Sequence, residues 1–101
     1  MIEVMSNMEM KELISSKVYD LEDRTKLFAQ DCRALMRVIL KDIPNREDGK
    51  QLVRASGSVA ANYIEANEAL SKKDFIYRLK VCRKEAKESR LWLDLICSLG
   101  I

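Results

Sequence analysis

The stretch RASGSVAANYIEAN, residues 54–67, is crowded with Ala, Ser and Gly, a composition shared by flexible linkers and closely packed helices. It contains no proline, and a seam at four-three spacing runs straight through it: Leu52, Ser56, Val59, Tyr63, Ala66 and Leu70. That period is typical of one face of a helix and argues against a linker. Gly57 in a helix interior costs roughly 1 kcal/mol relative to Ala. Close approach of a neighbouring helix offsets such a cost, so we expect a tightly packed helix over about residues 47–69.

A second, polar line follows the same stretch. Ser58, Asn62 and Glu65 recur at i, i+4 and i+7, so they share a face that borders the apolar seam. Half-buried polar groups need hydrogen-bond partners. Two interpretations are open: a structural network that fixes the register of the helices, which we favour, and a polar functional site.

Two more helices flank this one. On the N-terminal side, Phe28, Cys32, Leu35 and Ile39 step by four, three and four, which predicts a helix over about residues 20–42 that Pro44 ends. Asn45 is the predicted N-cap of the next helix. The segment 1–18 is either a short helix or a frayed tail.

On the C-terminal side, Ser71 is a predicted cap with Asp74 three residues on. A helix over about residues 72–99 follows, with a seam that alternates by four and three: Phe75, Leu79, Cys82, Ala86, Ser89, Leu93 and Ile96. Short connections between long helices make neighbours antiparallel. The sequence therefore predicts one all-α domain, residues 1–101, built as an antiparallel up-down helical bundle.

The end of the third helix is apolar nearly all round. Trp92, Leu95 and Leu99 lie well away from the seam on a helical wheel. A helix that is apolar on every side is buried on more than one. We expect an interface here, covered by a further helix, by the N-terminal segment or by another subunit.

The residue types present exclude several kinds of chemistry. The chain has no His, and Cys32, Cys82 and Cys97 lie far apart, so zinc motifs and His-dependent triads are absent. Carboxylate pairs such as Glu65 with Glu85 or Glu88 lack the Glu-x-x-His motifs of di-iron bundles. We expect no enzymatic activity, no metal and no cofactor. No run approaches the roughly 20 apolar residues of a membrane helix, so a cytoplasmic protein is expected.

The formal net charge of +2 is distributed unevenly. Residues 1–23 carry six acids and two bases, and residues 72–90 carry eight bases and three acids. Five bases share about a third of the third helix's circumference: Lys73, Lys80, Arg83, Lys84 and Lys87. A second line on the first helix includes Arg33, Arg37 and Lys41.

These basic lines allow two functions. Phosphate contact is electrostatic, so they suffice for sequence-independent binding of RNA or DNA. Alternatively the bases only solvate the bundle, and the protein is an oligomeric scaffold that binds protein partners through Trp92, Leu95 and Leu99.

The motifs of the second and third helices resemble those of a known family. The spacing is Gln51-x-x-Arg54-Ala55-x-x-Ser58-Val59-x-x-Asn62-x-x-Glu65, then Ser71-x-x-Asp74-Phe75-x-x-x-Leu79. It resembles the four-helix-bundle protein family, also called the large-subunit ribosomal RNA intervening-sequence protein family, over about residues 20–99. The chain departs from the family pattern at Ala66, where Gly is usual, and at Glu85, where a small or hydroxyl residue is common.

This resemblance implies an up-down four-helix bundle that assembles into a ring, commonly a pentamer. It implies no enzymatic activity. One relative is similar to an accessory protein of diversity-generating retroelements, which binds nucleic acid and a reverse transcriptase through a basic bundle surface. Family members continue into another long helix, so we expect either a truncated chain or an N-terminal segment that takes the fourth helix's place.

Overall fold

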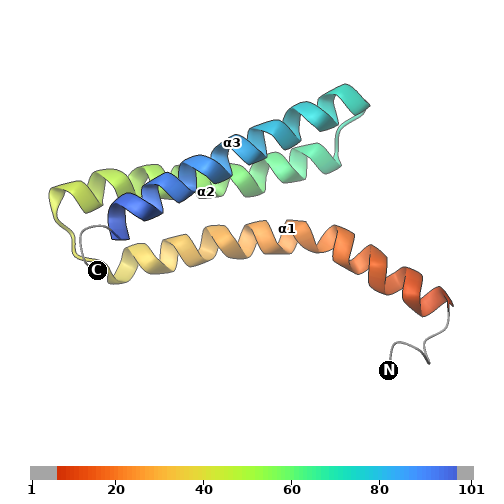
Figure 1. Cartoon of the computed structure of the whole chain (residues 1–101), viewed down its shortest axis with the longest axis horizontal. Helices are drawn as coiled ribbons and strands as arrows, with labels where there is room; N and C mark the ends of the chain where they lie inside the picture. Colours follow the sequence, from red (N-terminus) through yellow and green to blue (C-terminus); the bar gives the residue numbers. More distant parts are fainter. Residues whose placement is uncertain (1–6, 98–101) are drawn as a thin grey trace.

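The computed structural model describes the backbone of residues 7–97 and the side chains of residues 20–97. Within this part the chain forms three helices: α1 (Asn7–Val38), α2 (Ile43–Asn67) and α3 (Lys72–Cys97). Figure 1 shows α2 and α3 side by side as an antiparallel hairpin, with α1 returning along α2. The predicted all-α, up-down bundle is confirmed. Residues 7–18 continue α1 and do not form a separate fourth helix.

The boundary between α1 and α2 differs from the predicted one. Asp42, not Asn45, caps α2: its Oδ1 accepts a hydrogen bond of 2.9 Å from the backbone N–H of Asn45. Pro44 then lies in the first turn, where its missing N–H leaves no helical hydrogen bond unmade. The Asn45 side chain is buried instead, and its Nδ2 donates to the Leu40 carbonyl at 2.9 Å. The helix therefore starts at Ile43 rather than near residue 47.

The start of α3 is as the sequence predicts. Ser71 Oγ accepts a hydrogen bond of 3.1 Å from the backbone N–H of Asp74, and α3 begins at Lys72. Asp74 in the first turn faces the positive end of the helix dipole.

The core lies where all three helices meet, near the connection between α1 and α2. Its buried members come from each helix: Cys32 and Ile39 from α1, Leu52 from α2 and Ile96 from α3. Partly buried side chains pack against them: Phe28, Leu35, Met36, Trp92 and Leu93.

The α2 seam is buried as its spacing predicts except at Tyr63, which is half-buried, and at Leu70, which lies beyond the end of α2 and is fully exposed; the α3 seam is buried only in part. Leu52, Ser56, Val59 and Ala66 are buried in α2, whereas Phe75 and Ala86 of the α3 seam are exposed. The reason is that α3 packs mainly on α2, and α1 meets α3 only near the connection between α1 and α2.

The bundle is flat and extended. Its radius of gyration is 17.2 Å, against about 13 Å for a compact chain of 100 residues, and its shortest dimension is 17 Å. Large apolar side chains consequently stay exposed, among them Leu70 at the turn between α2 and α3. No helix in the described range is both long and apolar enough to cross a membrane.

Candidate nucleic-acid interface

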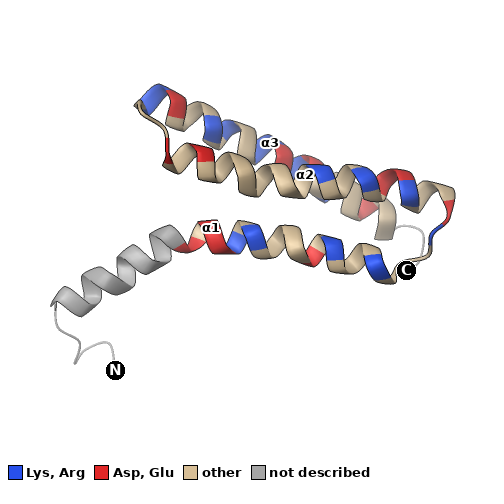
Figure 2. Cartoon of the chain, turned by 180° about the vertical axis from the view of Figure 1, so that it is seen from behind, with Lys and Arg blue, Asp and Glu red and all other residues tan. Residues whose placement is uncertain are grey.

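The five bases predicted on the third helix are all exposed on α3; we call Lys73, Lys80, Arg83, Lys84 and Lys87 the α3 stripe. Four of them, from Lys80 to Lys87, line one shallow, open groove together with Glu88. Lys80 also lines the next depression along the helix, with Lys72 and Lys73. The stripe is therefore continuous over about four turns of α3, and Figure 2 shows basic residues recurring along this helix.

The two acids beside the stripe pair with Arg54 of α2, although Glu88 still lines the groove with the bases. Arg54 Nη1 lies 3.4 Å from Glu85 Oε2, and Nη2 lies 3.1 Å from Glu88 Oε2. Glu85 keeps only 7% of its side chain exposed. Among residues 20–97, no ion pair joins Lys80, Arg83 or Lys87 to an acid, while Lys84 makes only a 4.0 Å contact with Glu85. Most of the stripe's positive charge is thus not offset by ion pairs within this range.

The second predicted basic line, on α1, is not part of this surface. Arg33 is half-buried, and its guanidinium donates to the carbonyls of Ala29 at 3.0 Å and Val53 at 3.4 Å. Lys41 lies beyond the end of α1 and donates to the carbonyl of Met36. Arg37 is exposed. These three bases therefore do not form a line that continues the α3 stripe.

Gly57 explains how Arg33 fits between the helices. A Cβ atom at Gly57 would lie 3.1 Å from Arg33 Nη2. The absence of a side chain at this position makes room for the guanidinium against α2. The sequence predicted a close contact at Gly57, but the partner is a side chain of α1 and not its backbone.

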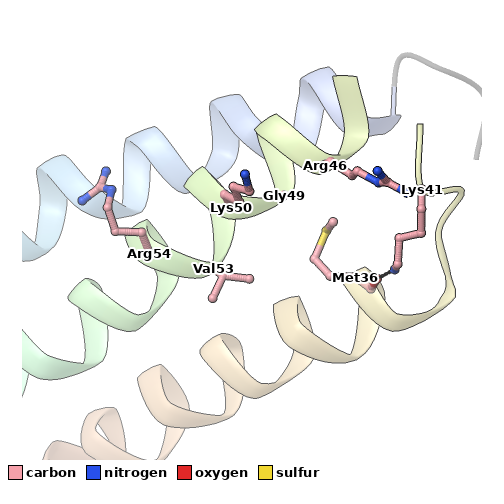
Figure 3. A pocket seen from close by; sticks show the side chains of 7 residues that line it. All are labelled: Met36, Lys41, Arg46, Gly49, Lys50, Val53 and Arg54. Atoms are coloured by element: carbon pink, nitrogen blue, oxygen red, sulfur yellow. Dashed lines mark hydrogen bonds between the residues drawn. The ribbon is translucent and has the colours of Figure 1, made fainter. Parts of the chain in front are cut away.

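A second group of bases, of which sequence reasoning identified only Lys41, lines a groove between α1 and α2 (Figure 3). We call it the α1–α2 groove; its lining residues are Met36, Lys41, Arg46, Gly49, Lys50, Val53 and Arg54. Arg46, Lys50 and Arg54 recur every four residues, a spacing that could have revealed a shared face of α2. Met36, Gly49 and Val53 give the groove an apolar lining.

The polar line of α2 is partly joined by hydrogen bonds. Asn62 Nδ2 donates to the carbonyl of Ser58 at 2.9 Å and to Ser58 Oγ at 3.0 Å. Arg78 of α3 donates to Asn62 Oδ1 at 3.0 Å and so ties the two helices together. Glu65 is exposed, in a separate hollow with Arg78, Asp74 and Tyr77.

The three residues of the predicted apolar interface differ in their surroundings. Trp92 is half-buried and packs against the core, so α1 and α2 already cover part of it. Leu95 is 41% exposed on α3. Leu99 lies outside the described residues.

The cysteines provide no metal centre. Cys32 is buried, Cys82 is half-buried and Cys97 is exposed, and all three are free. Burial raises the pKa of the Cys32 and Cys82 thiols above the usual value of 9.0. Over the side chains of residues 20–97, no three His, Cys, Asp or Glu gather closely enough to hold a metal ion.

The sequence of these helices matches a known protein family. The family model of the 23S rRNA-intervening sequence protein matches residues 24–101. The chain belongs to this family. Its structure is also similar to the crystal structure of a protein of unknown function from the S23 ribosomal protein family of Bacteroides thetaiotaomicron. That match has 32% sequence identity and a TM-score of 0.71, and it covers 78% of this chain and 73% of the other. No curated protein matches the chain.

Proposed function

We propose that this family member is a non-enzymatic, RNA-binding accessory factor of a ribonucleoprotein, and that the α3 stripe is its phosphate-binding surface. The observation that carries the proposal is the pairing of Arg54 with Glu85 and Glu88. By pairing with both carboxylates, Arg54 offsets negative charge beside the stripe, so that the lysines and Arg83 can attract phosphate oxygens. The family name, which refers to an intervening sequence of 23S rRNA, favours RNA as the nucleic acid.

The stripe has the chemistry of sequence-independent binding. Its members are Lys and Arg on one exposed face, and one aromatic residue, Tyr77, lines its N-terminal hollow. Base stacking along a single strand needs several aromatic platforms. Backbone phosphates are therefore the proposed ligand, with little discrimination among bases.

Self-association is the second part of the proposal. The chain carries a net charge of only +2, so one copy attracts nucleic acid weakly. A homo-oligomer, such as the pentameric ring that the family resemblance implies, would repeat the stripe in each subunit and raise the avidity. The exposed apolar side chains of the flat monomer supply surface for such contacts.

A salt titration of RNA binding tests the nucleic-acid part. Four phosphate contacts by Lys80, Arg83, Lys84 and Lys87 predict a slope near −3 in log affinity against log salt for a single strand. Affinity should fall roughly 50-fold between 50 and 200 mM salt. Replacing these four bases with Glu should abolish binding while circular dichroism stays helical. Unchanged affinity in this variant would refute the proposed surface.

The alternative function is an oligomeric scaffold for protein partners. Leu91 and Leu95 favour it, since they are 50% and 41% exposed on the same part of α3 as Trp92. An absence of RNA binding at low salt, together with capture of a defined partner that Leu91→Lys abolishes, would favour the scaffold over the RNA-binding factor.

A further inference from the structure

The α1–α2 groove combines two chemistries that a phosphate site does not need together. Its lining includes the apolar surfaces of Met36 and Val53, and its edges carry the charges of Lys41, Arg46 and Lys50 (Figure 3). Met36 reaches α2 at Gly49, where a Cβ atom would overlap its methyl group. A methionine side chain is flexible and fits irregular apolar partners. The groove therefore suits a ligand that is apolar on one side and acidic on its flanks.

The connection beside this groove adds further apolar surface. Val38, Leu40 and Ile43 flank Lys41 in sequence, and each is more than 70% exposed: 78%, 72% and 76%. Contiguous exposed apolar patches are typical of interaction sites in soluble proteins, and these three side chains lie within six residues of one another in the chain. An amphipathic helix would cover them better than a nucleic-acid backbone, which offers them no apolar partner.

The same chain contains a segment with the required chemistry. Residues 7–23, the acidic segment, hold five acids and two bases. Apolar residues recur in it at helical spacing: Met10, Ile14, Val18 and Leu21. At its described end, Asp20, Leu21, Glu22 and Asp23 are all exposed (Figure 2 shows the acids gathered there).

The acidic segment extends past the hairpin. Asn67, the last residue of α2, donates a hydrogen bond of 3.0 Å to Glu22 Oε2 of α1. Since α1 begins at Asn7, fifteen residues precede Glu22 in this helix, about 22 Å at 1.5 Å per residue. Figure 1 shows the backbone of α1 running on past the hairpin over this length.

The segment cannot enter the groove of its own chain. Both belong to one helix of 32 residues, about 48 Å long, with the acids near one end and Met36 near the other. We propose that the acidic segment of one copy binds in the α1–α2 groove of a second copy. Such a head-to-tail contact uses two different surfaces and closes into a ring when the rotation between copies allows it. The inference rests on the self-association proposed above and is independent of nucleic-acid binding.

Paired charge reversals test this contact in the whole chain. The groove variant carries Arg46→Glu and Lys50→Glu, and the segment variant carries Glu9→Lys and Glu12→Lys. Light scattering should show at least tenfold weaker association for each variant alone and recovery when all four changes are combined in one chain. The matched control, Lys80→Glu with Lys84→Glu, should keep the wild-type mass, because it changes two exposed bases on α3, outside the groove.

A peptide experiment tests the groove itself. A fluorescent peptide of residues 7–23 should bind the segment variant, whose grooves are vacant, and its affinity for the groove variant should be at least tenfold lower. If the groove variant and the segment variant both assemble to the wild-type mass, this inference is wrong, while the proposed self-association still holds. A monomeric wild-type chain whose segment variant also ignores the peptide would overturn both. Loss of RNA binding in the groove variant with unchanged mass would assign the groove to nucleic acid instead.

Discussion

Arg54 of α2 lies 3.4 Å from the buried carboxylate of Glu85 on α3, and it joins the hairpin at the middle of both helices. Arg54 is itself 53% exposed, so water screens part of the attraction. Removing Arg54 would nevertheless leave a buried charge without its main partner, which costs more than the ion pair itself contributes.

We therefore expect Arg54→Met to lower the free energy of unfolding by about 1–3 kcal/mol in urea denaturation. Lys50→Met is the matched control, since it removes the same charge one turn earlier on α2, from an exposed pair with Glu47 at 3.7 Å. The control should change stability by less than about 0.5 kcal/mol. Equal effects of the two substitutions would show that water solvates Glu85 without help from Arg54.

Gly57 provides the second prediction. Its missing Cβ leaves room for the Arg33 guanidinium, so Gly57→Leu should lower the free energy of unfolding by about 1–3 kcal/mol. In an Arg33→Ala background the same substitution should cost at least about 1 kcal/mol less, because the side chain that it displaces is gone. Ala61→Leu, on an exposed position of α2, is the control and should be close to neutral. If Gly57→Leu lowers the free energy of unfolding equally with and without the Arg33 side chain, the leucine clashes with a different residue.

Asn62 provides the third prediction, through its link to Arg78. Asn62→Ala removes three hydrogen bonds and leaves Arg78 without its acceptor, so the free energy of unfolding should fall by about 1–2 kcal/mol. Asn67→Ala removes one exposed hydrogen bond to Glu22 from the same helix and should cost less than about 0.5 kcal/mol. A smaller effect at residue 62 than at residue 67 would contradict a structural role for this part of the polar line.

Periodicity predicted which face of each helix is buried, because a hydrophobic seam depends only on the rotation between successive residues. It correctly identified Leu52, Val59 and Ala66 as buried. It failed at Phe75 and Ala86, since a period does not tell how far a neighbouring helix extends along the seam, and at Leu70, which lies past the end of α2. It also missed the burial of Glu85, which depends on Arg54, a residue 31 positions away.

In the candidate site, too, the features confined to one helix could be predicted, and those that join two segments could not. The exposed stripe on α3 could be predicted, because its members share one face of one helix. The α1–α2 groove could not be predicted, because it combines Lys41 of the connection with Arg46 and Lys50 of α2. The helix boundary between them was predicted four residues too late. Competition between Asp42 and Asn45 for the N-cap decides that boundary, and both residue types are good caps.

The cysteines provide the last prediction, which concerns pH. Burial raises the pKa of Cys32 and Cys82, so at a given pH each holds less thiolate in the folded chain than in the unfolded one. The thiolate is the nucleophile, so iodoacetamide should modify both more slowly than the exposed Cys97. Single-cysteine variants should show pH–rate curves for residues 32 and 82 that move to lower pH in urea. A curve for Cys32 that is identical in both states would contradict the burial.

The same shift affects stability, and its sign follows from proton binding. The folded state holds the Cys32 and Cys82 protons more tightly than the unfolded state, where the thiol pKa is near 9.0. Their contribution to the free energy of unfolding is therefore fully present below pH 9 and is lost as the pH rises through the folded-state pKa values. Replacing both with Ala should flatten this part of the pH–stability curve, whereas Cys97→Ala, the matched exposed control, should leave the slope unchanged. An unaltered slope in the double variant would assign the alkaline loss of stability to other groups.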